Sequence, residues 1–428
     1  MFRQHYFRSL GVSVVIAAVG GFALIAALGV RSASAQEDNR YWSPNPYEIK
    51  HVFVIALENH DWTQPTTIPG GIQPVYQNPN APFINSLVNG TALVYVDGQL
   101  RNISKQVSYA TAYHNVLATP SGNNLHIHPS EPNYLWAEAG TNFGILNDDD
   151  PYKDNPPNAQ NTTQHLSGLL QRTGKTWKSY QEDIDLQTDA SGHLVNLPLP
   201  ENQWTVPLVS LSGIFAPESP VNTYNATYQY NYAVKHNPQA FFTDTNGGDN
   251  TTTSNRLSRN YAPLQQLEFD LAKDRVADYN WITPDQFNEM HSGLTGGFAG
   301  LTGDSANIRA GDNAVSRLVP LIMSSQAYKD GGAIILWWDE SEDTGAPGDN
   351  ADDFSHTIGE IVISPLAHSN ENGVPYASSI DYSHSSDLRT MQEIFHVRAS
   401  GSSPWIGDAA NATDLSDMFA PGVIPSHP

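Results

Sequence analysis

Two pairs of oxygen-bearing side chains each follow directly after an apolar run that is typical of a buried strand. Glu58 and Asn59 follow residues 52–57, and Asp339 and Glu340 close the stretch AIILWWDE. The carboxyl ends of parallel strands meet at one edge of an α/β sheet, so both pairs would reach the same place. Carboxylate and amide oxygens are the ligands that hard divalent cations prefer. Together the pairs favour a metal site, although either pair alone would suit an ordinary solvated strand end.

A serine in the stretch HPSEPNYLW is a candidate nucleophile. Ser130 lies just before an expected helix start, where free backbone N–H groups could receive a phosphate group. The alternative is that Ser130 is simply the N-cap of that helix, with Glu131 and Pro132 in its first turn. The two roles are compatible.

Alternating strand and helix patterns surround these residues. Short apolar runs predict strands, and segments of helical period lie between several of them. This alternation predicts a layered α/β fold with a mostly parallel sheet. The expected strands lie at 52–57, 176–180, 239–245, 279–284, 331–342 and 359–366, and the expected helices at 81–88, 164–174, 264–274 and 312–332.

The chain of 428 residues divides into a leader and one large domain. Residues 1–35 carry Arg3 and Arg8 before an apolar run, and small residues precede a cleavage site after Ala35, as in a signal peptide. We therefore expect an exported protein, periplasmic or secreted, although the run is also long enough for an uncleaved membrane anchor. Residues 36–428 are expected to form a single domain, with 183–232 as an insertion or cap.

The charge balance and the missing motifs exclude several functions. The chain has 44 acidic and 21 basic residues and a net charge of -23, which disfavours nucleic acid as a partner. An anionic substrate would then need a local cation. The motifs for nucleoside triphosphates, dinucleotides, α/β-hydrolases and zincins are all missing from the sequence.

The ordered set of motifs resembles a known family. VIALENHDW, HPSEPNYLWAEAG, YAVKHNPQAF, WITPDQFNEMHSG, ILWWDESE and YSHSSDLRTMQEIF resemble the phosphoesterase family of acid phosphatases of the A type and phosphocholine-preferring phospholipases C. That family belongs to the alkaline-phosphatase-like superfamily. The resemblance implies a three-layer α/β/α sandwich with a mostly parallel central sheet and long loop insertions.

The resemblance also implies roles for individual residues. Glu58, Asn59, Asp339 and Glu340 would bind one or more divalent metal ions (Ca, Mg, Mn, Zn or Fe), together with the nucleophile Ser130. Glu340 stands where the family commonly carries a second aspartate. His236 and His291 match histidines that line the phosphate site and would be catalytic. Asn133 and His128 are the candidate substrate-binding residues, although the longer lead-in to Ser130 means that the resemblance itself transfers no upstream histidine. The sequence assigns no role to His114, His126, His356 and His384.

These observations predict a metal-dependent phosphoesterase. The most direct version is an acid phosphatase that hydrolyses phosphomonoesters through a phosphoserine intermediate. A phospholipase C acting on phospholipid headgroups is the alternative, and only that version would make a membrane lipid a partner. Two other classes stay open: a glycosidase using Glu58 and Asp339 as its carboxylate pair, and a non-catalytic exported phosphate-binding protein. The oligomeric state cannot be read from the sequence.

Overall fold

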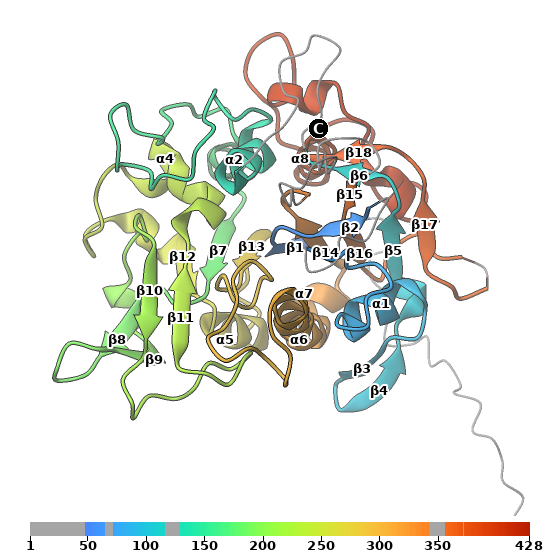
Figure 1. The fold of residues 1–428 in the computed structure, drawn as a ribbon. Helices are drawn as coiled ribbons and strands as arrows, with labels where there is room; N and C mark the ends of the chain where they lie inside the picture. Colours follow the sequence, from blue (N-terminus) through green and yellow to red (C-terminus); the bar gives the residue numbers. More distant parts are fainter. Residues whose placement is uncertain (1–47, 65–71, 116–128, 342–355, 371) are drawn as a thin grey trace, which may run out of the picture. The chain divides into compact units, whose positions relative to one another are not determined.

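A computed structural model describes residues 48–64, 72–115, 129–341, 356–370 and 372–428 (Figure 1). The predicted leader, His126 and His128 lie outside these ranges. Within the ranges, no helix combines the length and the apolar character needed to cross a bilayer.

An eight-stranded sheet forms the centre of the described domain. Five of its seven strand pairs are parallel, and β16 runs antiparallel to both of its neighbours, β14 and β5. β1 and β14 are buried along almost their whole length, which explains their continuous apolar sequences. In spatial order the strands are β12 (Tyr261–Pro263), β7 (Trp177–Gln181), β13 (Tyr279–Thr283), β1 (His51–Leu57), β14 (Gly332–Trp338), β16 (Glu360–Ile363), β5 (Val107–Ala110) and β17 (Tyr376–Ser378).

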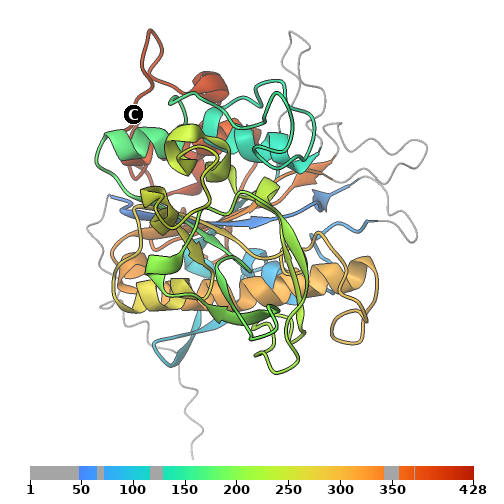
Figure 2. The same cartoon turned by 90° about the vertical axis from the view of Figure 1, so that its left-hand side faces the viewer.

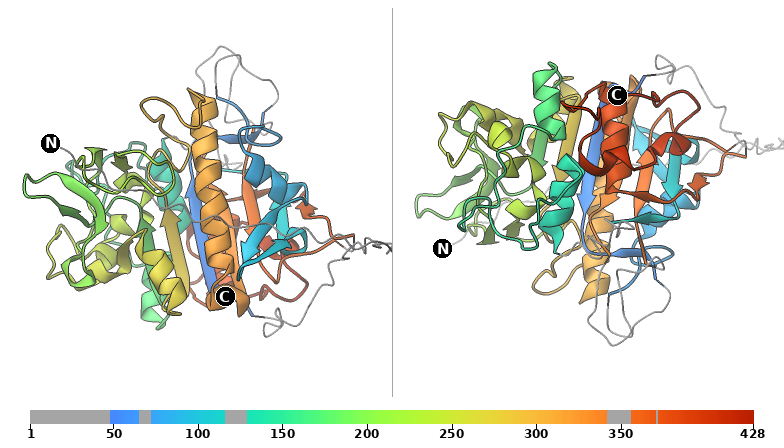
Figure 3. Two further views of the ribbon diagram at one scale, coloured as in Figure 1. Left: turned by 90° about the horizontal axis from the view of Figure 1, so that it is seen from below. Right: turned by 90° about the horizontal axis from the view of Figure 1, so that it is seen from above.

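Helices cover both faces of the sheet. Figures 1 and 2 show one helical layer above the strands and one below them, and Figure 3 shows α6 lying along the strands on the lower face. The predicted α/β/α arrangement is therefore confirmed. The upper layer contains α2 (Ser130–Ala139), α3 (Leu166–Arg172), α4 (Thr243–Asn246) and α8 (His384–Phe395), and the lower layer α1 (Pro82–Val88), α5 (Gln266–Ala272), α6 (Asp304–Met323) and α7 (Gln326–Lys329).

Among the described residues, five small two-stranded sheets lie outside the central one. Two of them, β8–β9 and β10–β11, fall in the region predicted as an insertion or cap. Their strands are β8 (Leu186–Thr188), β9 (Leu194–Pro198), β10 (Leu211–Ile214) and β11 (Gln229–Tyr232). The other three pair β2 (Asp61–Thr63) with β15 (Thr357–Ile358), β3 (Leu93–Val96) with β4 (Gln99–Asn102), and β6 (Tyr113–His114) with β18 (Tyr382–Ser383).

One predicted strand is wrong. Residues 239–245 form the 3-10 helix η5 (Pro238–Phe241) and the start of α4 instead. Phe241 and Phe242 are fully buried in this short helical segment. A brief apolar run has no period that separates a strand from a buried helical turn, and Pro238 at the first helical position favours the turn.

Candidate active site

The ends of β1 and β14 bring the two acidic pairs together. The strands are parallel and in register, with Leu57 opposite Trp338, so the residues that follow them are neighbours. The backbone N–H of Asn59 donates to Asp339 Oδ1 over 3.2 Å. Asn59 has a φ of 40°, in the left-handed region that asparagine tolerates better than most residues.

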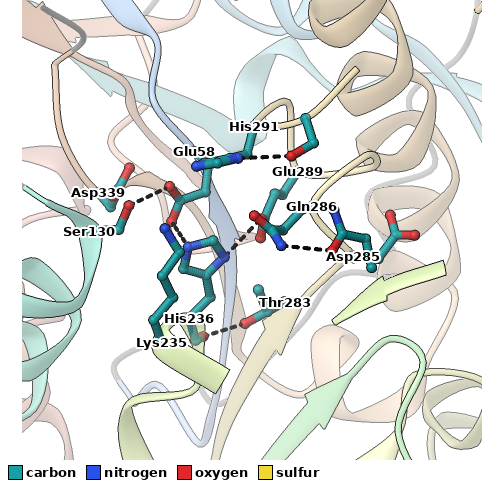
Figure 4. A network of polar contacts seen from close by, with 12 residues as sticks. Glu58, Ser130, Lys235, His236, Thr283, Asp285, Gln286, Glu289, His291 and Asp339 are labelled. Atoms are coloured by element: carbon teal, nitrogen blue, oxygen red, sulfur yellow. Dashed lines mark hydrogen bonds and ion pairs between the residues drawn. The ribbon is translucent and has the colours of Figure 1, made fainter. Parts of the chain in front are cut away.

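The hydroxyl of Ser130 lies among these side chains. Its Oγ donates to Glu58 Oε2 over 2.9 Å (Figure 4). Asn59 Oδ1 and Glu340 Oε1 each lie 3.5 Å from the same Oγ. Ser130, Glu58, Asp339 and Glu340 are all buried. The structure thus brings together the five residues that the sequence predicts as metal ligands.

The first turns of α2 deliver two more contacts to this cluster. The side-chain amide of Asn133 donates to Glu340 Oε2 over 2.9 Å. The hydroxyl of Tyr134 donates to Glu58 Oε1 over 2.6 Å. Both acidic residues are therefore held from the helix that carries Ser130.

Ser130 is not the N-cap of α2. It is the first helical residue, and Pro129, which has no side-chain acceptor, occupies the N-cap position. The N–H of Glu131 already donates to Asp148 Oδ1 over 3.1 Å, and Pro132 has no N–H. The helix start therefore offers fewer free donors to a phosphate group than the sequence suggests.

His236 bridges two buried carboxylates. Its Nε2 lies 3.1 Å from Glu58 Oε1, and its Nδ1 lies 2.8 Å from Glu289 Oε1 (Figure 4). The ring stacks on Tyr134, with centroids 5.1 Å apart. Burial holds the pKa of His236 well below its ordinary value, with help from Lys235 and His291. The ring nitrogens are close to both carboxylates but do not meet hydrogen-bond geometry with either of them.

His291 and Lys235 are two further nitrogen-bearing side chains near the cluster. Burial and the neighbouring Lys235 lower the pKa of His291 to about 4. Burial alone would lower the pKa of Lys235, but the carboxylates of Glu58 and Asp148 outweigh it and raise that pKa. Lys235 is therefore a fixed cation beside the cluster, held by Asp148 Oδ2 at 2.7 Å.

The electrostatics of the cluster fit a bound cation. Burial, and then the charge of Asp339, raise the pKa of Glu58 well above its ordinary value, and burial and Glu340 do the same for Asp339. Asp339 Oδ2 is buried and accepts no hydrogen bond within the described part of the chain. Several like charges in a dry site with an oxygen left unpaired are the setting in which proteins hold a divalent ion.

Three of the histidines without an assigned role lie in the described ranges, and each has a different position relative to the cluster. His384 lies directly behind Asp339, with its Nε2 bonded to the Asp339 backbone carbonyl and its Nδ1 accepting from Trp337 over 3.0 Å. His356 lies 3.2 Å from Asp61 Oδ2. His114 is buried in β6.

Three residues of the site escape the sequence analysis. Tyr134, Lys235 and Glu289 all lie inside the motifs that carry the resemblance, each next to or near a residue that was singled out. Tyr134 is four residues after Ser130, and that spacing on a helix places both on one face. Glu289 carries no such signal, because only the folded loop after β13 turns it toward His236.

Comparison with known proteins decides the family. The model of the phosphoesterase family matches residues 122–398. The chain belongs to the phosphoesterase family. The match contains Ser130, His236, His291, Asp339 and Glu340, while Glu58 and Asn59 lie before it.

Relatives of this phosphoesterase include fungal acid phosphatases. A probable acid phosphatase of Kluyveromyces lactis is 24% identical over 296 residues, which are 68% of this chain and 55% of that protein. An acid phosphatase of Aspergillus fumigatus is 28% identical over 165 residues, covering 38% of this chain and 28% of that protein. The chain thus spans about half, or less, of the length of these relatives.

Solved structures with a similar chain trace include an alkaline phosphatase superfamily protein from Vibrio parahaemolyticus. It is 13% identical and has a TM-score of 0.42, with 89% of this chain and 74% of that chain covered. Similarity at this level adds nothing to the family assignment.

Proposed function

We propose that this phosphoesterase is an exported, metal-dependent acid phosphatase that hydrolyses phosphomonoesters with Ser130 as its nucleophile. The observation that carries the proposal is the position of Ser130 Oγ, 2.9 Å from Glu58 and within 3.5 Å of Asn59 and Glu340. Family membership and the acid phosphatases among the relatives support the reaction class. The predicted leader supports export.

Glu58, Asn59, Asp339 and Glu340 would hold the divalent cation, with Ser130 Oγ completing the set. When bound, such an ion supplies positive charge that stabilises an alkoxide and the oxygens of a phosphoryl group. Its identity is left to metal analysis, since oxygen ligands suit several divalent ions.

Glu58 is placed to take the proton of Ser130. Glu58 Oε2 accepts the hydroxyl hydrogen over 2.9 Å, which gives the proton a direct path as the Ser130 oxygen attacks. The Ser130 oxygen then forms a bond to phosphorus while the bond from phosphorus to the ester oxygen breaks. The product is a phosphoserine, which water hydrolyses in a second displacement.

His291 is the better placed of the two catalytic histidines to protonate the leaving oxygen. Both ring nitrogens of His236 lie close to carboxylates, so His236 suits electrostatic support of Glu58. His291 has a pKa of about 4 in the free protein, and a bound phosphate dianion would raise it by its negative charge. We also propose Asn133 as a substrate-binding residue, because its side-chain amide lies at the cluster and donates to Glu340.

The test compares two serines that each occupy the first turns of an upper-layer helix. Ser130→Ala should lower kcat with p-nitrophenyl phosphate by several powers of ten, each factor of ten being about 1.4 kcal/mol. Ser385→Ala at the start of α8 is the control, since Ser385 bonds Trp136 and Asp408 rather than this cluster. Near-normal turnover by Ser130→Ala would refute the proposal.

The same assay separates the alternatives. A phospholipase C would hydrolyse phosphatidylcholine vesicles faster than p-nitrophenyl phosphate. A non-catalytic binding protein would bind inorganic phosphate and turn over neither substrate. A glycosidase would hydrolyse neither phosphoester. Its mechanism uses two carboxyl groups and does not explain the hydrogen bond between Ser130 and Glu58.

A further inference from the structure

A second group of buried carboxylates lies at the ends of β7 and β13. Glu182 and Asp183 follow β7, Asp285 follows β13, and the strands are parallel with Gln181 opposite Thr283. One oxygen from each of the three acids lies within 4.8 Å of the others. Figure 4 shows Asp285 beyond Glu289 as seen from Ser130, so this group is separate from the candidate active site.

Both carboxylate oxygens of Glu182 accept hydrogen bonds. Asn222 donates to its Oε1 over 2.6 Å, the backbone N–H of Asp285 donates to its Oε2 over 2.9 Å, and the amide of Asn288 lies within 3.1 Å of both oxygens. These neutral donors fix the Glu182 carboxylate in place. They do not cancel its charge.

Asp183 and Asp285 each keep one buried oxygen without a donor. Asp183 Oδ2 accepts from the backbone of Asn231, and Asp285 Oδ1 accepts from the backbone of Phe287 and Asn288. Asp183 Oδ1 and Asp285 Oδ2 accept no hydrogen bond from any described amide, hydroxyl or basic group, and the two carboxyl groups are close enough to share a proton. Both residues are 1% exposed, so bulk water does not replace the missing donors.

No basic side chain balances these charges. Within the ranges that the structure describes, no lysine, arginine or histidine forms an ion pair with any of the three acids. Arg317 lines a cavity of about 480 Å³ that also reaches Glu182, but it donates to the carbonyl of Thr223. An unbalanced group of buried carboxylates is costly, because each opposes ionisation of the others.

We propose that Glu182, Asp183 and Asp285 bind a hard divalent cation, calcium or magnesium, at a structural site distinct from the one beside Ser130. A donor set made of carboxylate oxygens alone excludes a preference for soft metals. The ion pairs with the two donorless oxygens and offsets the charge of the cluster. The cavity of about 480 Å³ lies beside Glu182, on one side of this cluster.

The position of this site gives the ion a structural role. It joins the end of β7 to the loop after β13, which continues to Glu289 and His291. The donors from Asn222 and Asn231 also tie the predicted insertion 183–232 to the same point. The cation therefore fastens the insertion and the histidine-bearing loop to the sheet.

The first experiment counts bound metal. The protein, Asp183→Asn, Asp339→Asn and the double variant are equilibrated with Ca²⁺ or Mg²⁺, desalted, and measured by inductively coupled plasma mass spectrometry. Asp183→Asn should hold one equivalent less than the unchanged protein, and the double variant one less than Asp339→Asn. Equal metal content with and without Asp183→Asn would overturn the proposal.

The second experiment does not require Asp183→Asn to fold. Thermal unfolding of Asp339→Asn is followed with Ca²⁺ or Mg²⁺ and with a chelator, so that the cation beside Ser130 is weakened in both samples. The cation should raise Tm, because a ligand of the native state stabilises it. Asp185→Asn is the matched control, since Asp185 bonds Thr205 instead and its loss should leave the rise intact.

A shared proton between Asp183 and Asp285 is the competing explanation. It predicts that neither Ca²⁺ nor Mg²⁺ changes the Tm of Asp339→Asn. That result would overturn the proposal. Failure of the phosphatase assay with Ser130→Ala would not affect this site, since the two tests use different residues and readouts.

Discussion

Tyr134 offers a sharp test of how Glu58 is held. Its hydroxyl donates to Glu58 Oε1 over 2.6 Å, while its ring stacks on His236 and meets Trp281 and Trp337 edge-on. Tyr134→Phe keeps the ring and removes one hydrogen bond to a buried carboxylate. A hydrogen bond to a charged group contributes about 1.5–3 kcal/mol to stability.

The effect should be largest on metal binding. A residue that orients a metal ligand typically changes metal affinity or activity by about 10–100-fold when it is removed. We therefore expect Tyr134→Phe to raise the divalent-ion concentration at half-maximal activity by this factor, and excess metal to restore most of kcat. The assay is p-nitrophenyl phosphate hydrolysis titrated with metal from a chelated, metal-free start.

Tyr180→Phe is the matched control. The Tyr180 hydroxyl donates to Asp270 Oδ2 over 2.9 Å in an equally buried setting. Its loss should lower the free energy of unfolding by a similar amount and leave the metal midpoint unchanged. A Tyr134→Phe midpoint equal to that of the unchanged protein, or an equal shift in Tyr180→Phe, would refute the reasoning.

Two further predictions concern packing and pH. A Cβ on Gly311 would meet Met290 Cγ at 2.2 Å, so Gly311→Ala should displace the loop next to His291. We expect a lower kcat in enzyme assays and a loss of about 1–3 kcal/mol in the free energy of unfolding, measured with urea. Unchanged activity would contradict this prediction. Burial raises the pKa of Asp312 from 3.8 to about 6, so the folded state holds this proton more tightly than the unfolded state and loses stability as pH rises from about 4 to 6. Between pH 4 and 7, the free energy of unfolding of Asp312→Asn should rise relative to that of the unchanged protein by up to about 3 kcal/mol. If urea unfolding shows the same pH dependence for both proteins, the raised pKa of Asp312 is contradicted.

The sequence predicts the parts of this site that a strand end or a helix start delivers. Glu58 and Asp339 could be paired because parallel strands end at one edge, and β1 and β14 are indeed neighbours. Ser130 could be placed near a helix start, although not at the correct helical position. These predictions depend on local periodicity and on one rule of sheet topology.

Contacts that depend on loop conformation could not be predicted. Glu289 reaches His236 only because the loop after β13 folds back, and Met290 within it adopts a φ of 86° that a bulky side chain rarely takes. The strand wrongly predicted at 239–245 has the same origin, because a short apolar run takes its conformation from its surroundings. The antiparallel direction of β16 likewise has no local signal in its sequence.

The most direct measurement of the central claim is the detection of phosphate on Ser130. The protein is mixed with p-nitrophenyl phosphate, quenched in acid within the first turnover, digested, and analysed by mass spectrometry for a phosphorylated peptide containing residues 129–139. The account predicts one phosphoryl group on Ser130 and none in Ser130→Ala. Burst release of p-nitrophenol with an unmodified Ser130 peptide would contradict it.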